Sequence, residues 1–170
     1  MSASPWRSSP RFFSGKPVTP EDLKLEQQYF REKLKRHNRS LHGFGIVSGL
    51  KVTVNSGQIV VAPGLALDCE GNELAIEATQ AIVPAPTVAW QTAYLNLRYV
   101  EECSDLASTT ANVTEGFELT VGPENCNRGH RHLRARWLAC GQPHPLTLAK
   151  LRQSSHGWRI DRAYRAPRIK

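Results

Sequence analysis

The 170-residue chain lacks the long apolar run that a membrane-spanning helix requires. Such a helix needs about 20 consecutive apolar residues, and the longest uncharged apolar-rich stretch, residues 78–94, is interrupted by Pro84 and Pro86. Residues 1–16 are rich in Ser, Pro and Arg and hold no apolar core of the kind that a secretory signal contains. The sequence therefore predicts a cytoplasmic protein.

Cysteine is scarce, with four residues at widely separated positions, whereas small secreted domains held by disulfides are dense in cysteine. Cys103, Cys126 and Cys140 together with His132 could form a tetrahedral zinc site, because thiolates and imidazoles suit this ion. No C-x-x-C pair marks such a site, and buried thiols that pack as small apolar side chains are the alternative. Zinc therefore stays a minor alternative, and no other cofactor is predicted.

Motifs of catalysis are also missing from the sequence. It contains no G-x-S-x-G nucleophile elbow and no H-E-x-x-H zinc helix. The glycine-rich stretch 41–49 follows a predicted helix and precedes a predicted strand, which is the reverse of the order in a dinucleotide-binding loop. We interpret it as a tight joint in which glycines allow positive φ or close backbone contact. The sequence predicts that the protein is not an enzyme.

The length suits one domain with a substantial core. Residues 1–18 are predicted to form a flexible arm, and residues 19–170 a single domain containing a helix and β-strands. The arm carries Trp6, Phe12 and Phe13 among Ser, Pro and Arg, and such arms are usually disordered until a partner binds. We expect these three aromatic side chains to bind a partner.

Residues 20–38 carry the clearest helix pattern. Thr19 is a suitable N-cap, Pro20 occupies the first helical position, and acidic residues follow in the first turn. Along one face the spacing alternates between four and three residues, through Leu23, Gln27, Phe30, Leu34, His37 and Leu41. Such a face needs something to pack on, either the chain's own sheet or another subunit.

From Gly45 onward the hydrophobic pattern alternates as in β-strands. Strands are predicted at 46–54, 58–62, 65–68, 73–76, 92–100, 115–121, 146–151 and 158–164. The first four are short and closely spaced, which indicates an antiparallel meander. The predicted fold class is α+β or mainly β, with an N-terminal amphipathic helix packed on an antiparallel sheet or small sandwich.

The same pattern predicts the places and roles of individual side chains. Phe30, Leu41, Phe44 and Trp137 are expected in the hydrophobic core. Asp68 is expected to cap a turn by accepting hydrogen bonds from backbone N–H groups, rather than to bind a metal.

The formal net charge of +7 is unevenly distributed. Residues 1–51 carry +6, residues 52–127 carry −9 and residues 128–170 carry +10. Arg131, Arg134 and Arg136 form the strongest basic patch, which could bind phosphates. The same residues could instead dock on an acidic protein or pair with the acidic middle of this chain. No nucleic-acid-binding module is complete, so we expect them to bind a protein partner and keep nucleic acid as the alternative.

Two longer motifs resemble a known family. Residues 41–52 read LHGFGIVSGLKV and residues 61–74 read VAPGLALDCEGNEL, after a helix that contains Arg31, His37 and Asn38. This pattern resembles small proteins encoded with phage-tail-like contractile injection systems, and the likeness covers most of the chain after residue 19.

The resemblance implies a structural role in assembly or anchoring, at or near the baseplate of such a particle. The partners would be other particle subunits, and no catalytic residue is implied. The implied location is a large cytoplasmic particle, with membrane contact left open.

Overall fold

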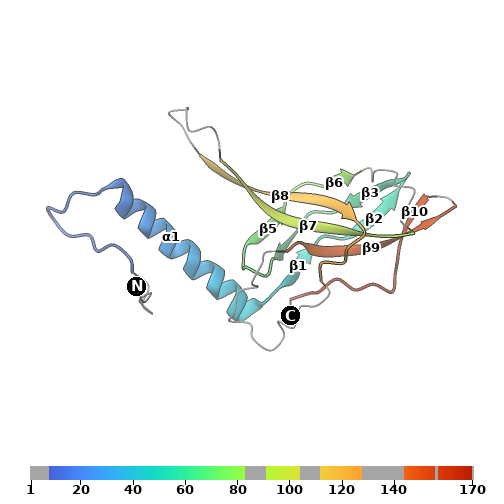
Figure 1. Ribbon diagram of the computed structural model, residues 1–170, viewed down its shortest axis with the longest axis horizontal. Coiled ribbons are helices and arrows are strands. Elements are labelled where there is room, and N and C mark those ends of the chain that lie inside the picture. The colour runs from blue at the N-terminus through green and yellow to red at the C-terminus, as the bar shows by residue number, and fades with distance from the viewer. Residues whose placement is uncertain (1–7, 83–90, 104–111, 128–143, 156, 170) are drawn as a thin grey trace.

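The computed structural model describes residues 8–82, 91–103, 112–127, 144–155 and 157–169 (Figure 1). One N-terminal helix precedes a set of antiparallel strands, which confirms the predicted class of a mainly β fold with a helix. The helical elements are α1 (Pro20–His37) and the π-helical turn η1 (Asn38–His42). The strands are β1 (Gly45–Gly49), β2 (Val52–Asn55), β3 (Gln58–Val61), β4 (Gly64–Leu67), β5 (Glu73–Ile76), β6 (Gln80–Ile82), β7 (Thr92–Cys103), β8 (Val113–Gly122), β9 (Leu146–Ser154) and β10 (Gly157–Ile160).

Helix α1 begins at Pro20, as predicted, because Thr19 and Asp22 cap its first turn with a reciprocal pair of hydrogen bonds. The Thr19 hydroxyl accepts a hydrogen bond from the Asp22 backbone N–H at 3.1 Å, and the Asp22 carboxylate accepts one from the Thr19 N–H at 3.3 Å. This reciprocal capping box satisfies two N–H groups that would otherwise lack helical partners. The helix continues through η1 and ends at Gly43, whose φ of 86° suits glycine.

Strands β1 to β6 form one antiparallel meander that is bent in the middle. β1, β4 and β5 pair on one side of the bend, and β2, β3 and β6 pair on the other. Hydrogen bonds from Leu50 N to Pro63 O and from Ala62 N to Lys51 O cross the bend, so the pairing continues through it. Because Gly49 and Leu50 have φ values of 60° and 52°, the strand predicted at 46–54 is two strands. Strand β6 was not predicted.

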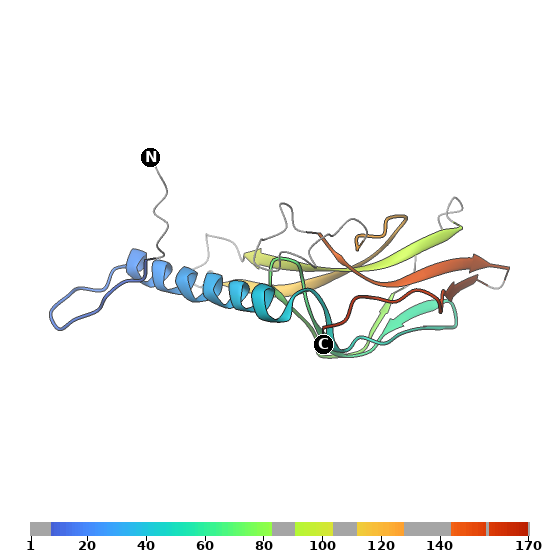
Figure 2. The same ribbon diagram turned by 90° about the horizontal axis from the view of Figure 1, so that it is seen from below.

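The other strands form a four-stranded sheet in the order β10-β9-β7-β8, built on the long hairpin of β7 and β8. Figure 2 shows this sheet as a layer above the meander. The core lies between the two layers and contains Ile59, Leu74 and Ile76 from the meander and Leu95, Leu97, Leu146 and Leu151 from the sheet. The predicted strand 158–164 ends earlier, at Ile160.

The predicted packing of the helix on a sheet is wrong, because helix α1 projects from one end of the β body (Figures 1 and 2). The prediction that Phe30 and Leu41 are core residues is therefore wrong, since they are 55% and 62% exposed. Phe44 is partly buried against the core, as predicted, with its ring centroid 5.4 Å from that of His144. Trp137 lies outside the described residues.

Candidate assembly surface

The base of the projecting helix is fixed to the turn between β4 and β5. Asn38 is 5% exposed, and its side-chain amide donates a hydrogen bond to the Gly71 carbonyl at 3.0 Å. The Arg39 guanidinium donates to the Glu70 carbonyl at 2.6 Å. A Cβ atom on Gly71 would lie 2.2 Å from the Lys35 carbonyl oxygen, and Gly71 also has a φ of 86°. The helix backbone therefore rests directly on a glycine, which no larger residue could replace without movement.

Asp68 holds that turn rigid. One carboxylate oxygen accepts hydrogen bonds from the Glu70 and Asn72 backbone N–H groups, each at 2.8 Å. The other oxygen accepts from the Asn72 side-chain amide at 2.7 Å. These bonds confirm the predicted turn-capping role, and they fix the carbonyls to which the helix binds.

The glycine-rich stretch forms the joint between helix and strand, as predicted. A Cβ atom on Gly45 would lie 2.7 Å from the Pro167 carbonyl oxygen, and one on Gly49 would lie 2.1 Å from the Pro63 carbonyl oxygen. The C-terminal segment runs beside β1, where Ile46 N donates to Pro167 O at 2.8 Å and Ile169 N donates to Ile46 O at 3.0 Å. Backbone therefore fills the space beside these glycines.

The end of β7 supports the side of the helix. The Arg31 guanidinium forms an ion pair with the Glu101 carboxylate, which also accepts a hydrogen bond from the Tyr99 hydroxyl at 2.9 Å. The Lys35 ammonium lies 6.0 Å from the centroid of the Tyr99 ring. Burial and the bond to Glu101 raise the pKa of Tyr99 above its ordinary value, so the phenol stays protonated. Tyr99 and Glu101 thus form a polar support for the middle of α1.

The free face of α1 is apolar and exposed. We call the residues Leu23, Gln27, Phe30, Leu34, His37 and Leu41 the stripe. Its four large apolar side chains are between 52% and 62% exposed, and among the residues of α1, all of which the structure describes, none is buried. The polar contacts to the β body come from Arg31, Lys35, Asn38 and Arg39, which lie outside the stripe. The sequence predicted this face correctly but not that the β body leaves it uncovered.

The arm before the helix adds further exposed aromatic surface. Phe12 and Phe13 are 42% and 65% exposed. The Lys16 ammonium lies 5.3 Å from the centroid of the Phe12 ring and forms an ion pair with Asp22 at 2.9 Å. This bond and the Thr19 N–H lower the pKa of the Asp22 carboxyl below its usual value. Trp6, Arg131, Arg134 and Arg136 lie outside the described residues, so their predicted partner-binding role stays a prediction.

Of the predicted zinc ligands, the structure describes Cys103 and Cys126, and it places these two far apart. Cys103 ends β7, whereas the Cys126 backbone N–H donates to Thr147, whose hydroxyl binds Asn96 in the first half of β7. Cys103 lies seven positions beyond Asn96 along the extended strand, a distance of roughly 23 Å at about 3.3 Å per residue. One ion cannot bind both thiolates, since a Zn–S bond is about 2.3 Å. Cys140 and His132 lie outside the described residues.

A buried polar cluster joins the loop after β8 to the sheet. The Thr147 hydroxyl donates to the Asn96 side-chain oxygen at 2.6 Å, and the Asn127 amide donates to the Thr147 carbonyl and the Tyr164 hydroxyl, each at 2.8 Å. Thr147 is fully buried and Asn96 is 6% exposed. This cluster was not predicted, although polar residues at inward positions of two apolar strands are a signal that marks it.

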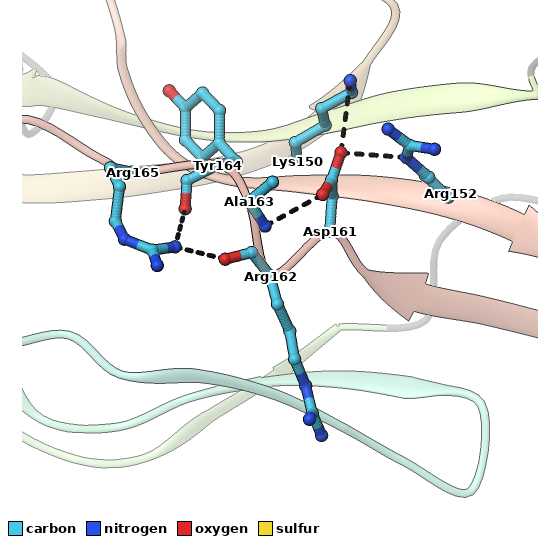
Figure 3. A network of polar contacts seen from close by, with 7 residues as sticks. All are labelled: Lys150, Arg152, Asp161, Arg162, Ala163, Tyr164 and Arg165. Carbon is cyan, nitrogen blue, oxygen red and sulfur yellow. Dashed lines mark hydrogen bonds and ion pairs between the residues drawn. The ribbon is translucent and has the colours of Figure 1, made fainter.

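Figure 3 shows a second polar network, in the segment that follows β10. The Asp161 carboxylate accepts a hydrogen bond from the Ala163 N–H at 3.0 Å and from Arg152 Nε at 2.9 Å, and lies 3.3 Å from Lys150 Nζ. The Ala163 N–H and the two cations lower the pKa of Asp161 below its ordinary value. This network fixes the turn that directs the chain back toward β1.

The fold and the exposed face together define a two-layer β domain that carries a projecting helix with an exposed apolar face. Over the described residues, no helix is both long enough and apolar enough to cross a bilayer. Likewise, no cluster of three or more metal-ligating side chains occurs in the part of the chain that the structure describes.

Comparison with known proteins identifies similar folds but no family. No protein-family model matches the chain, and no curated protein matches it. Among solved structures, a chain of the type VI secretion system TssK–TssF–TssG baseplate subcomplex is 12% identical, with a TM-score of 0.54 over 94% of this chain and 61% of that one. The crystal structure of TssK is 10% identical, with a TM-score of 0.57 over 95% of this chain and 42% of that one. At this identity the likeness is one of fold, and this chain spans only part of the length of both.

Proposed function

We propose that this protein is a structural subunit at or near the baseplate of a phage-tail-like contractile injection system. The observation that carries the proposal is a fold similar to that of TssK over nearly the whole chain. The two glycine motifs support it, because they resemble proteins of such systems. The proposed role is assembly or anchoring, and we assign no catalytic residue.

The geometry suits a subunit that presents surfaces to neighbours. The glycine joint and the Asp68 turn hold the base of α1 against the β body. Residues 8–18 of the arm lie at the N-terminal end of the capped helix, away from the β body (Figure 2). Exposed Phe12 and Phe13 would be buried in a neighbouring subunit, where aromatic anchors contribute much of the binding energy.

The charge distribution supports the same role. The basic ends and the acidic middle of the chain would steer docking by complementary charge, which raises association rates. Neighbouring baseplate subunits are the proposed partners.

The proposal is tested by tagging the chain at its own locus and purifying complexes after nuclease treatment. Mass spectrometry and negative-stain imaging should show baseplate subunits and particles labelled at one end. Phe12→Ser with Phe13→Ser should reduce incorporation, whereas Val113→Ser, which changes an exposed apolar residue on β8, should not. Recovery of the chain without particles would contradict the proposal. Recovery with nucleic acid in an untreated sample would instead favour the basic patch as a nucleic-acid-binding surface.

A further inference from the structure

The exposed stripe has the spacing of a coiled-coil seam. Its members alternate at four and three residues, so Leu23, Phe30 and His37 take the d position of a heptad and Gln27, Leu34 and Leu41 take the a position. We propose that α1 pairs in parallel, and in register, with α1 of a second copy of this chain. This inference goes beyond the proposed function and does not depend on it.

The seam is available to a second helix because the β body holds α1 by other residues. Arg31, Lys35 and Asn38 contact the body from positions outside the stripe. The seam also has a hollow lined by Leu23, Glu26, Gln27, Phe30 and Arg31. In a coiled coil, side chains of one helix insert into such holes on the other.

The charges beside the seam favour a second copy as the partner. Glu26 directly precedes Gln27 at an a position, so it occupies a g position. Arg31 directly follows Phe30 at a d position, so it occupies an e position. A parallel, in-register pair brings Glu26 of each helix to Arg31 of the other, and one sequence supplies both halves of the ion pair. The guanidinium of Arg31 has five N–H donors, and its side chain is 49% exposed beside Glu101, so it can bind both carboxylates.

The other flanking charges favour the parallel orientation. Lys24 faces the neutral Thr19, and Lys33 faces the neutral Asn38, so the parallel pair contains no like-charged contact. In an antiparallel pair, e positions of both helices share one side, which places Lys24 of one helix beside Arg31 of the other. The g positions share the other side and place Glu26 beside Lys33. Like-charged contacts then offset these attractions, whereas the parallel pair has only the attraction between Glu26 and Arg31. A polar Gln27 within the seam also sets the register, since a single polar a residue specifies alignment at a cost in stability.

The association is tested by sedimentation velocity on the purified full chain over a concentration series. Leu23→Glu places a charge in the seam, and Leu25→Glu makes the same change two residues away on the opposite face, at a side chain that is also exposed. The wild type and Leu25→Glu should associate equally. Leu23→Glu should weaken association at least tenfold, with an unchanged circular dichroism spectrum. A monomeric wild type, or equal effects of both variants, would overturn the inference.

The orientation is tested by disulfide formation in a background with Cys103→Ser and Cys140→Ser. A parallel seam places the two Gln27 side chains together, so Gln27→Cys should cross-link rapidly and Gln28→Cys, outside the seam, should not. Cross-linking of both variants at the same rate would refute the parallel seam. If the chain is monomeric in solution but is incorporated into particles, only this inference is refuted. If the chain associates with itself but is absent from particles, only the proposed function is refuted.

Discussion

Replacing Gly71 by alanine should weaken the mounting of α1 through two separate effects. A non-glycine residue at a φ of 86° costs roughly 1–2 kcal/mol in steric strain. The added Cβ would also lie 2.2 Å from the Lys35 carbonyl oxygen, so the helix or the turn must move. That movement disrupts the hydrogen bond from Asn38 to the Gly71 carbonyl, which contributes about 1 kcal/mol. We expect a total loss of about 2–4 kcal/mol.

Gly57→Ala is a control that measures the cost of backbone strain at positive φ without a steric contact to the added Cβ atom. Gly57 has a φ of 80°, but nothing lies within 4 Å of the position of its Cβ. Its replacement should therefore cost only the strain, roughly 1–2 kcal/mol. Urea unfolding of the two variants, followed by circular dichroism, measures both free energies of unfolding.

Hydrogen exchange shows where the Gly71→Ala loss occurs. If the helix base is released while the core stays folded, amides of residues 35–43 should exchange faster, and those of β7 and β9 should not change. Equal destabilisation by Gly57→Ala and Gly71→Ala, with normal protection at the helix base, would refute the reasoning that this glycine is required for close backbone contact.

Three further predictions concern the β body. Thr147→Val should lower the free energy of unfolding by about 1–3 kcal/mol, because Asn96 loses a buried hydrogen-bond donor, whereas Thr147→Ser retains the hydroxyl and should cost less. The pKa of Asp161 is lowered by folding, so its contribution to stability is present at neutral pH and is lost as the pH falls through the folded value. Asp161→Asn should therefore be less stable at pH 7 and lose less stability below about pH 4 in a pH series of urea unfolding. Burial raises the pKa of the Cys126 thiol, so mass spectrometry should show slower alkylation at neutral pH than at the exposed Cys103.

Local chemistry allowed the helix and most strands to be predicted from the sequence. Thr19, Pro20 and Gly43 mark the helix ends by capping, which depends only on near neighbours in the chain. The bend at Leu50 was not predictable, because no sequence signal marks a leucine with positive φ. Hydrogen bonds to a distant strand hold it there.

The candidate surface was predictable only in part, because its exposure depends on contacts between residues that are far apart in the sequence. A spacing of three and four residues identifies one face of a helix, but it does not show what covers that face. Phe30 was expected in the core because it lies on the apolar face of the helix, yet the joint directs the helix away from both sheets. The direction depends on the backbone contact at Gly71, far along the chain from the helix.

The residues that carry the family resemblance and those of the stripe have different tasks. Arg31 and Asn38 bind the β body, and Gly71 permits backbone contact with the helix, so these three positions serve the mounting of the helix. Four members of the stripe, Leu23, Gln27, Phe30 and Leu34, lie outside the resembling pattern, whereas His37 and Leu41 belong to it. A protein with the same motifs and a different stripe should therefore project its helix in the same way but associate with a different partner. Exchange of the stripe between two such proteins, followed by sedimentation of their mixtures, would test this separation of tasks.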